Sequence, residues 1–164
     1  MNKIAQDIID AMITKHLSEE AQAFFIHWYS DEDKTDEDRE ILAHLAKSNV
    51  KPYNGSNLFR GCKKLMNGAA ESYSISAYIA GRFAGDDGYV IAIDTERFCF
   101  STFNLSNYIY DLIGEIVWGE KENDFFSEDF INSFDERSAE DEVIVLTDLE
   151  CSVVMKVHSI GCEL

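Results

Sequence analysis

The chain has few of the residues that usually mark linkers, metal sites and disulfide frameworks. Proline occurs once in 164 residues, at Pro52, so no proline-rich linker divides the chain. The four cysteines have no C-x-x-C spacing and the four histidines are scattered, which indicates neither a zinc site nor a disulfide framework. We therefore expect reduced thiols in a cytoplasmic protein that holds no metal.

Long apolar runs and glycine-rich phosphate loops are also missing. The first residues, Met1-Asn2-Lys3-Ile4, do not open an apolar leader, and no stretch approaches the length that spans a membrane. We therefore expect no membrane association. No G-x-G-x-x-G segment occurs, so the sequence does not support a Rossmann dinucleotide site.

Basic residues are outnumbered by acidic residues, 14 to 31, which gives a net charge of -17. Such a surface repels phosphate backbones, so we expect no direct binding of nucleic acid. The same field attracts a basic protein and speeds its arrival. An acidic surface that only keeps the protein soluble is an equally weighted alternative.

What the chain does have is enough apolar sequence, 46% of its residues, for one domain with a hydrophobic core over residues 1–164. Residues 1–52 form a helical N-terminal part, because apolar residues recur there at helical spacing. Ser18 and Thr35 are the expected N-caps of the second and third helices.

Short strands dominate from residue 53 onward, which predicts an α+β fold with helices first and strands later. Residues 119–138 mix acidic and aromatic side chains and support no assignment. We expect strands at 58–62, 72–76, 89–93, within 97–103, at 143–146 and at 151–158, and helices at 77–83 and 106–118.

Arg60 stands inside one of these apolar strands and is followed by Gly61. A guanidinium in such a place needs an anionic or acceptor partner, and its planar fork suits a phosphate or a carboxylate. Gly61 would let a ligand approach the backbone closely. The simpler alternative is an arginine on an edge strand that faces water.

Two further sets of polar residues lie at element boundaries. Ser74 and Ser76 flank Ile75 at the end of a strand, where they can bind a ribose or a carboxylate, or Ser76 can simply cap the next helix. Glu140 and Glu142 lie two apart at the entrance to an apolar strand, where their carboxylates can project side by side into a cleft. In a chain this acidic, such a pair also occurs by chance.

The order of the three sets resembles the arginine–serine–glutamate ADP-ribosyltransferases. This cholera-toxin-like family includes toxins, vertebrate arginine-specific transferases and enzymes that tailed bacteriophages bring into their hosts. The matching segments, at 58–61, 72–84 and 140–146, lie within a resemblance that spans about residues 53–158. One departure is Ile75, where the family usually has threonine.

The resemblance implies a two-sheet split β-sandwich over residues 53–164 that binds NAD as co-substrate. It implies transfer of ADP-ribose from NAD to a protein side chain, arginine in the closest cases, with release of nicotinamide. Glu142 would be the catalytic carboxylate on the ribose 2′-OH, and Arg60 would pair with the phosphates. Gly61 would present backbone groups to nicotinamide, Ser74 would position Glu142 and the ribose, and Ser76 would support the strand-to-helix corner.

The resemblance also implies that Glu140 faces the acceptor guanidinium, where it can orient the group and accept its proton. Phe98, Phe100 and Phe103 are all candidates for the aromatic neighbour of nicotinamide. The acceptor would be a basic protein, in the host cytoplasm if the enzyme is phage-borne.

Two other functions remain open at this point. A non-enzymatic acidic inhibitor that mimics a polyanion would bind a basic protein without binding NAD. An NAD glycohydrolase toxin of the same fold would release free ADP-ribose. The sequence leaves open which protein is modified and whether the chain forms oligomers.

Overall fold

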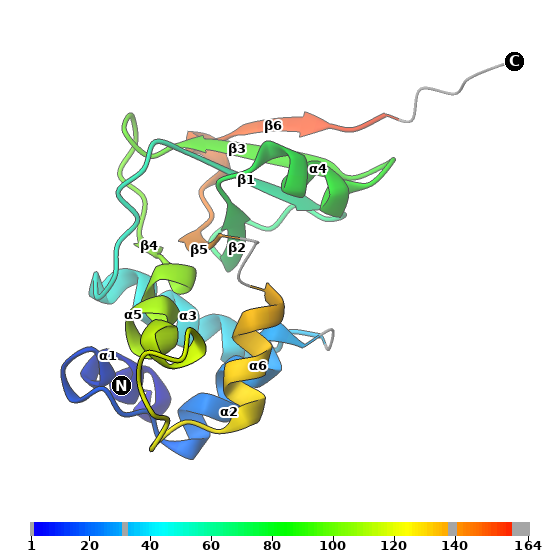
Figure 1. Cartoon of the computed structure of the whole chain (residues 1–164). Helices are drawn as coiled ribbons and strands as arrows, with labels where there is room; N and C mark the ends of the chain where they lie inside the picture. Colours follow the sequence, from blue (N-terminus) through cyan, green and yellow to red (C-terminus); the bar gives the residue numbers. More distant parts are fainter. Residues whose placement is uncertain (1, 31–32, 138–140, 159–164) are drawn as a thin grey trace, which may run out of the picture.

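The computed structural model describes residues 2–30, 33–137 and 141–158, which form a helical part and a β-sheet part (Figure 1). Five of the helices gather at one end, and the sheet with helix α4 lies at the other. The elements are α1 (Lys3–Thr14), α2 (Glu19–Tyr29), α3 (Asp36–Ser48), β1 (Asn57–Cys62), β2 (Ala70–Ser74), α4 (Ala77–Ala84), β3 (Tyr89–Asp94), β4 (Thr102–Phe103), α5 (Leu105–Val117), α6 (Glu128–Arg137), β5 (Glu142–Leu146) and β6 (Val153–Lys156).

The N-terminal helices begin where side chains can accept hydrogen bonds from the first unpaired backbone N–H groups. Ser18 Oγ accepts from the N–H of Ala21 at 3.2 Å, and Thr35 forms a reciprocal capping box with Asp38. Both predicted N-caps are therefore confirmed. None of the described helices is long and apolar enough to cross a membrane.

The strands form one open antiparallel sheet in the order β4-β5-β2-β1-β3-β6. The predicted α+β class is confirmed, but the described strands do not form the two-sheet sandwich that we expected. The sheet narrows at its centre, where β1 and β2 pair at one register position, Phe59 opposite Ser74. By contrast, β1 and β3 pair from Asn57–Asp94 to Cys62–Tyr89. Two three-stranded halves are thus joined at a narrow junction.

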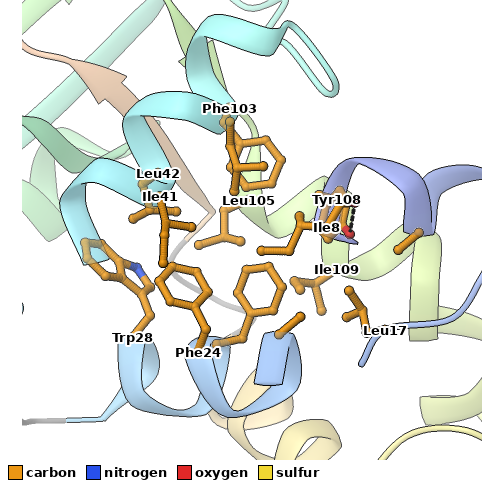
Figure 2. Packing of buried hydrophobic residues seen from close by; sticks show 14 of the residues in the cluster. Ile8, Leu17, Phe24, Trp28, Ile41, Leu42, Phe103, Leu105, Tyr108 and Ile109 are labelled. Atoms are coloured by element: carbon orange, nitrogen blue, oxygen red, sulfur yellow. Dashed lines mark hydrogen bonds between the residues drawn. The ribbon is translucent and has the colours of Figure 1, made fainter. Parts of the chain in front are cut away.

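Two hydrophobic clusters pack against the sheet. The larger cluster packs α1, α2, α3, α5 and α6 against residues of β4 and β5, such as Phe103 and Ile144 (Figure 2). Within it, the Tyr108 hydroxyl donates to the Ile8 carbonyl at 2.6 Å, which ties α5 to α1. The smaller cluster spans the junction, because it joins Leu58 and Ile91 of the outer half to Tyr73, Val143 and Val145 of the inner half. Burial of these apolar side chains stabilises both halves by about 2 kcal/mol for each large residue.

Several boundaries differ from the expected ones. β2 ends at Ser74 rather than at residue 76, because Ser76 leaves the sheet and its Oγ accepts from the N–H of Ile79 at 3.4 Å as the N-cap of α4. Helix α6 was not predicted, although it buries Phe130 and Phe134 in the larger cluster. Its acidic composition concealed this apolar face.

Helix α4 packs directly against β1 at Gly61. A Cβ at Gly61 would lie 1.7 Å from the carbonyl oxygen of Ala80 and 2.6 Å from the backbone nitrogen of Ala84. No side chain fits in that space, so glycine is required for the approach of helix to strand. This contact places α4 beside the junction of the two half-sheets.

The capping box of α3 predicts a pH-dependent contribution to stability. Burial raises the pKa of Asp38, but hydrogen bonds from the Thr35 backbone and hydroxyl, and the nearby His27, lower it below its usual 3.8 overall. The contribution of a carboxyl with a lowered pKa is present above its unfolded pKa and is lost as the pH falls through the folded pKa.

We expect Asp38→Ala to lower the free energy of unfolding by about 1 kcal/mol near neutral pH. The difference from wild type should shrink below the ordinary Asp38 pKa of 3.8, measured by urea denaturation across pH. A difference that stays constant down to about pH 2.5 would contradict an ionised cap.

Candidate functional site

A cavity of about 340 Å³ lies where β1 and β2 diverge beside the Phe59–Ser74 pair. Its walls come from both the sheet part and the helical part. The sheet part contributes β1, β2, α4 and the first residue of β5, and the helical part contributes the C-terminal end of α2 and the N-terminal end of α3. The polar side chains in its walls belong to Ser30, Lys34, Arg39, Arg60, Glu71, Ser72, Ser74 and Glu142. The cavity therefore collects four of the predicted site residues, Arg60, Gly61, Ser74 and Glu142, from three neighbouring strands.

Arg60 fills the space that the diverging strands leave open. Its Nη1 donates to the carbonyl of Ser72 on β2 at 2.7 Å, and its Nη2 lies 2.5 Å from Glu71 Oε2. The guanidinium thus donates a hydrogen bond to the Ser72 carbonyl of β2, at a position where the backbones of β1 and β2 are not paired. The alternative of an edge-strand arginine facing water is wrong, since β1 lies between β2 and β3.

Glu71 is the partner that the sequence did not reveal. Its carboxylate is 4% exposed and lies between two guanidiniums, with Oε1 accepting from Arg39 Nε at 3.3 Å. Arg39 also donates through Nη1 to the carbonyl of Lys34 at 2.6 Å. One buried carboxylate therefore joins α3, β2 and β1 at the edge of the cavity.

Glu142 is the first residue of β5 and is 7% exposed. Its Oε1 accepts from the indole Nε1 of Trp28 at 2.9 Å, and its backbone N–H donates to Ser106 Oγ at 2.7 Å. Trp28 comes from the end of α2, far away in the sequence, and helical spacing alone gave no sign of this contact. Side chains of two helices, α2 and α5, thus hold the carboxylate and the backbone of Glu142.

The two predicted serines have different positions. Ser74 lies directly opposite Glu142 in the sheet register and is a wall residue of the cavity, and its Oγ accepts from the N–H of Ser76 at 3.1 Å. Ser76 caps α4 and is outside the described walls of the cavity. Ser74 is therefore a neighbour of Glu142, and Ser76 has the alternative role of a helix cap, while the expected contact of Ser74 with a ribose stays a prediction.

Gly61 and Glu140 complete the predicted set. Gly61 lies in the cavity wall, but its missing side chain makes room for the backbone of α4 rather than for a ligand. Glu140 lies outside the described residues, which resume at Asp141, an exposed residue with a positive φ of 44°.

The aromatic side chains at the cavity are not the ones we expected. Phe103 is buried in the larger cluster, and Phe98 and Phe100 line a separate surface groove near β5. Phe59 and Phe83, together with three other rings from Trp28, Tyr29 and Tyr73, take these places in the cavity wall instead. A flat ring can stack against such walls.

The charge in the cavity wall is opposite to the charge of the whole chain. Three cations, Lys34, Arg39 and Arg60, stand against two carboxylates, Glu71 and Glu142, in a chain of net charge -17. Lys34 Nζ donates to the carbonyl of Ser30 at 2.7 Å and lies 5.5 Å above the ring of Trp28. The cavity can therefore hold an anion beside a buried carboxylate and flat rings.

Among the described residues, no group of three or more histidine, cysteine, aspartate or glutamate side chains is placed to hold a metal ion. Comparison with protein-family models, with curated proteins and with solved structures finds no match to this chain. The geometry of the cavity therefore carries the functional argument.

The buried ion pairs of Glu71 predict a large effect on stability. Glu71→Gln removes the charge that separates Arg39 and Arg60 and leaves two partly buried guanidiniums beside each other. We expect the free energy of unfolding to fall by about 3 kcal/mol, measured by denaturant titration. As a control, Glu20→Gln breaks an exposed pair with Lys3 and should change little. If Glu71→Gln lowered the free energy of unfolding as little as Glu20→Gln does, water would already screen the ion pairs of Glu71.

Proposed function

We propose that the protein is a mono-ADP-ribosyltransferase that moves ADP-ribose from NAD to a protein side chain, arginine in the first place. The observation that supports this most is the meeting of Arg60, Ser74 and Glu142, distant in the sequence, around one cavity. Their strands β1, β2 and β5 are neighbours in the sheet. The narrow junction between the half-sheets is also compatible with the split sheet of the family that the sequence resembles.

The cavity fits one half of a dinucleotide. Its volume of about 340 Å³ is at the lower end of ligand pockets, which suits a nicotinamide ring with its ribose, while the rest of NAD extends from the mouth. Phe59 and Phe83 offer faces for the ring. The cations Arg60, Arg39 and Lys34 offer charge to the diphosphate.

Arg60 can serve the phosphates despite its ion pair. A guanidinium carries five N–H donors, and the contacts with Glu71 and the Ser72 carbonyl use only some of them. The same contacts fix the plane of the guanidinium before a ligand arrives, which reduces the entropy lost on binding. The ion pair thus orients Arg60 toward the cavity.

Bound NAD supplies a glycosidic bond with a good leaving group. In the proposed reaction the bond between ribose C1′ and the nicotinamide nitrogen breaks, and nicotinamide leaves with the electron pair. Glu142 binds the ribose 2′-OH and stabilises the positive charge that develops on the ring. The acceptor nitrogen then attacks C1′ and gives up one proton, for which Glu140 is the candidate base.

Trp28 holds the proposed catalytic carboxylate in place. Its indole donates to one oxygen of Glu142 in a setting where both residues are buried, and Ser106 accepts from the Glu142 backbone. The indole contact removes rotational freedom from the carboxylate, and the Ser106 contact fixes the backbone beneath it. Trp28 is therefore a positioning residue in this proposal.

Glu142→Gln tests the proposed function. Glutamine keeps the shape of the side chain but removes the negative charge, so transfer should fall by at least about a hundredfold with folding and NAD affinity largely retained. The measurement is the incorporation of labelled ADP-ribose into protein after incubation with labelled NAD and a cell lysate.

Three outcomes separate the competing functions. Transfer at the wild-type level by Glu142→Gln would reject the assignment. Free ADP-ribose without labelled protein would identify an NAD glycohydrolase. Failure of the wild-type protein to bind NAD would support the acidic-inhibitor alternative instead.

Trp28→Phe tests the positioning role. A smaller aromatic ring takes the place of the indole, and the N–H donor to Glu142 is lost. We expect kcat to fall about tenfold while KM for NAD changes little, as for other residues that orient a reacting group.

The chain offers a matched control, since its other tryptophan, Trp118, is 66% exposed and lies outside the described walls of the cavity. Trp118→Phe should leave kcat and KM for NAD unchanged. A kcat for Trp28→Phe equal to the wild-type value, with only the free energy of unfolding lowered, would reduce Trp28 to a packing residue.

A further inference from the structure

A second hollow of about 510 Å³ lies between the end of α5 and residues 118–126. We call it the aromatic groove and define it by Tyr110, Trp118 and Phe125 with the acidic side chains around them. In the part of the chain that the structure describes, no residue lines both this groove and the cavity at the sheet junction. The groove is therefore separate from the proposed catalytic site.

Large aromatic side chains stand exposed at the groove. Trp118 is 66% exposed, Phe125 61% and Tyr110 47%, and the rings of Tyr110 and Trp118 meet edge to face at 5.5 Å. Buried Phe126 and Leu112 complete the lining. Exposed tryptophan and tyrosine at a concave surface are the residues that contribute most to protein interfaces.

The charge around these rings is strongly negative. The lining contains two lysines and five acidic residues, Asp111, Glu115, Glu120, Glu122 and Asp124. Asp111 is paired with Lys51 at 2.5 Å. The other four acids form no ion pair with any residue that the structure describes. The groove thus combines apolar rings with carboxylates that can accept cations.

The end of α5 adds to this negative field. The C-terminus of a helix carries a partial negative charge, and the last turn of α5 contains no basic residue to offset it. The C-cap of α5 is Trp118 itself, so the exposed ring stands where the helix dipole ends. A lysine or arginine placed beside this ring meets carboxylates, backbone carbonyls and an aromatic face together.

The charge decides which occupant fits. A second copy of this chain, at net charge -17, would be repelled, and so would a nucleic acid. Residues 159–164 of this chain contain one glutamate and no lysine or arginine, so they offer no complement either. A protein segment with basic and apolar side chains can pair with the carboxylates and pack against the rings.

We propose that the aromatic groove binds a segment of a partner protein in which arginine or lysine side chains alternate with apolar ones. The apolar side chains pack against Trp118 and Phe125, and the basic side chains pair with the surrounding carboxylates. This binding goes beyond the proposed function, because it needs neither NAD nor the catalytic residues. If the partner is the acceptor, the groove holds it while its target side chain reaches the cavity.

The two tryptophans allow a direct test by NMR. The indole N–H of Trp28 is bonded to Glu142, whereas that of Trp118 belongs to the groove, so a ¹⁵N spectrum reports on the two sites separately. The probe is a short synthetic peptide in which arginine alternates with leucine. We expect saturable shifts of the Trp118 signal with no shift of the Trp28 signal.

Two further peptides and a set of variants sharpen the test. Peptides in which glutamate replaces arginine, or serine replaces leucine, should bind at least about tenfold more weakly, because each lacks one half of the complement. Phe125→Ala and the pair Glu120→Gln with Glu122→Gln should each weaken binding about tenfold, and binding should also weaken in salt. The matched controls are Tyr78→Ala, an exposed ring on α4, and the exposed acids Asp86→Asn and Asp87→Asn.

Three results would overturn the proposal. The Trp118 signal could fail to shift with the peptide, or the control variants could lose as much affinity as the groove variants. The protein could also form a dimer that Trp118→Ala dissociates, which would make a second copy the occupant. A titration with NAD is followed separately through the Trp28 signal. A shift of Trp28 with NAD, without a shift of Trp118 with the peptide, rejects the groove proposal alone. A Trp118 response without any effect of NAD at Trp28 removes the enzyme proposal and leaves the groove.

Discussion

The buried carboxylate of Glu71 between Arg39 and Arg60 is the constraint on which the site depends. It joins the helical part to both half-sheets at the place where β1 and β2 separate. The ion pair fixes the orientation of the Arg60 guanidinium, which donates to the Ser72 carbonyl. Without Glu71, this carbonyl would lose its donor from Arg60. The separation of the strands, and hence the cavity, is tied to this ion pair.

A buried ion pair is an expensive way to hold a fold together. Well-packed apolar residues of similar size often stabilise a core as well or better, so stability alone does not explain the arrangement. Two guanidiniums around one carboxylate leave positive charge in the cavity wall, with Lys34 nearby. This excess is what an anionic ligand needs, and it links the structural role of Glu71 to the proposed function.

The sequence predicted local features well and long-range contacts poorly. Ser18 and Thr35 were identifiable as caps because a cap depends on neighbours a few residues away. Trp28 lies in the predicted helical part, but apolar spacing cannot show that its N–H reaches Glu142 from another element. Glu71 was missed in the same way, since its partners Arg39 and Arg60 come from α3 and β1.

Other differences have a common physical cause in how elements meet. The pattern that predicted strands could not reveal whether they form one sheet or two, because that depends on the pairing of β1 with β2 and with β3. Gly61 was singled out for close approach, but the approaching group is the backbone of α4. Phe98, Phe100 and Phe103 were reasonable by composition, yet the rings in the cavity wall, such as Phe59 and Phe83, come from β1 and α4.

Charge is distributed so that the two proposed ligands experience different forces. The net charge of -17 acts over a distance of about 10 Å at moderate salt, where it opposes an anionic dinucleotide and favours a basic protein. NAD would therefore depend on the short-range contacts of Arg60, Arg39 and Lys34 inside the cavity. A basic partner would be drawn in from a distance and then be held at Trp118 and its neighbours. An acidic surface around a cationic cavity would thus separate the recognition of the two proposed ligands, which a uniformly charged surface could not do.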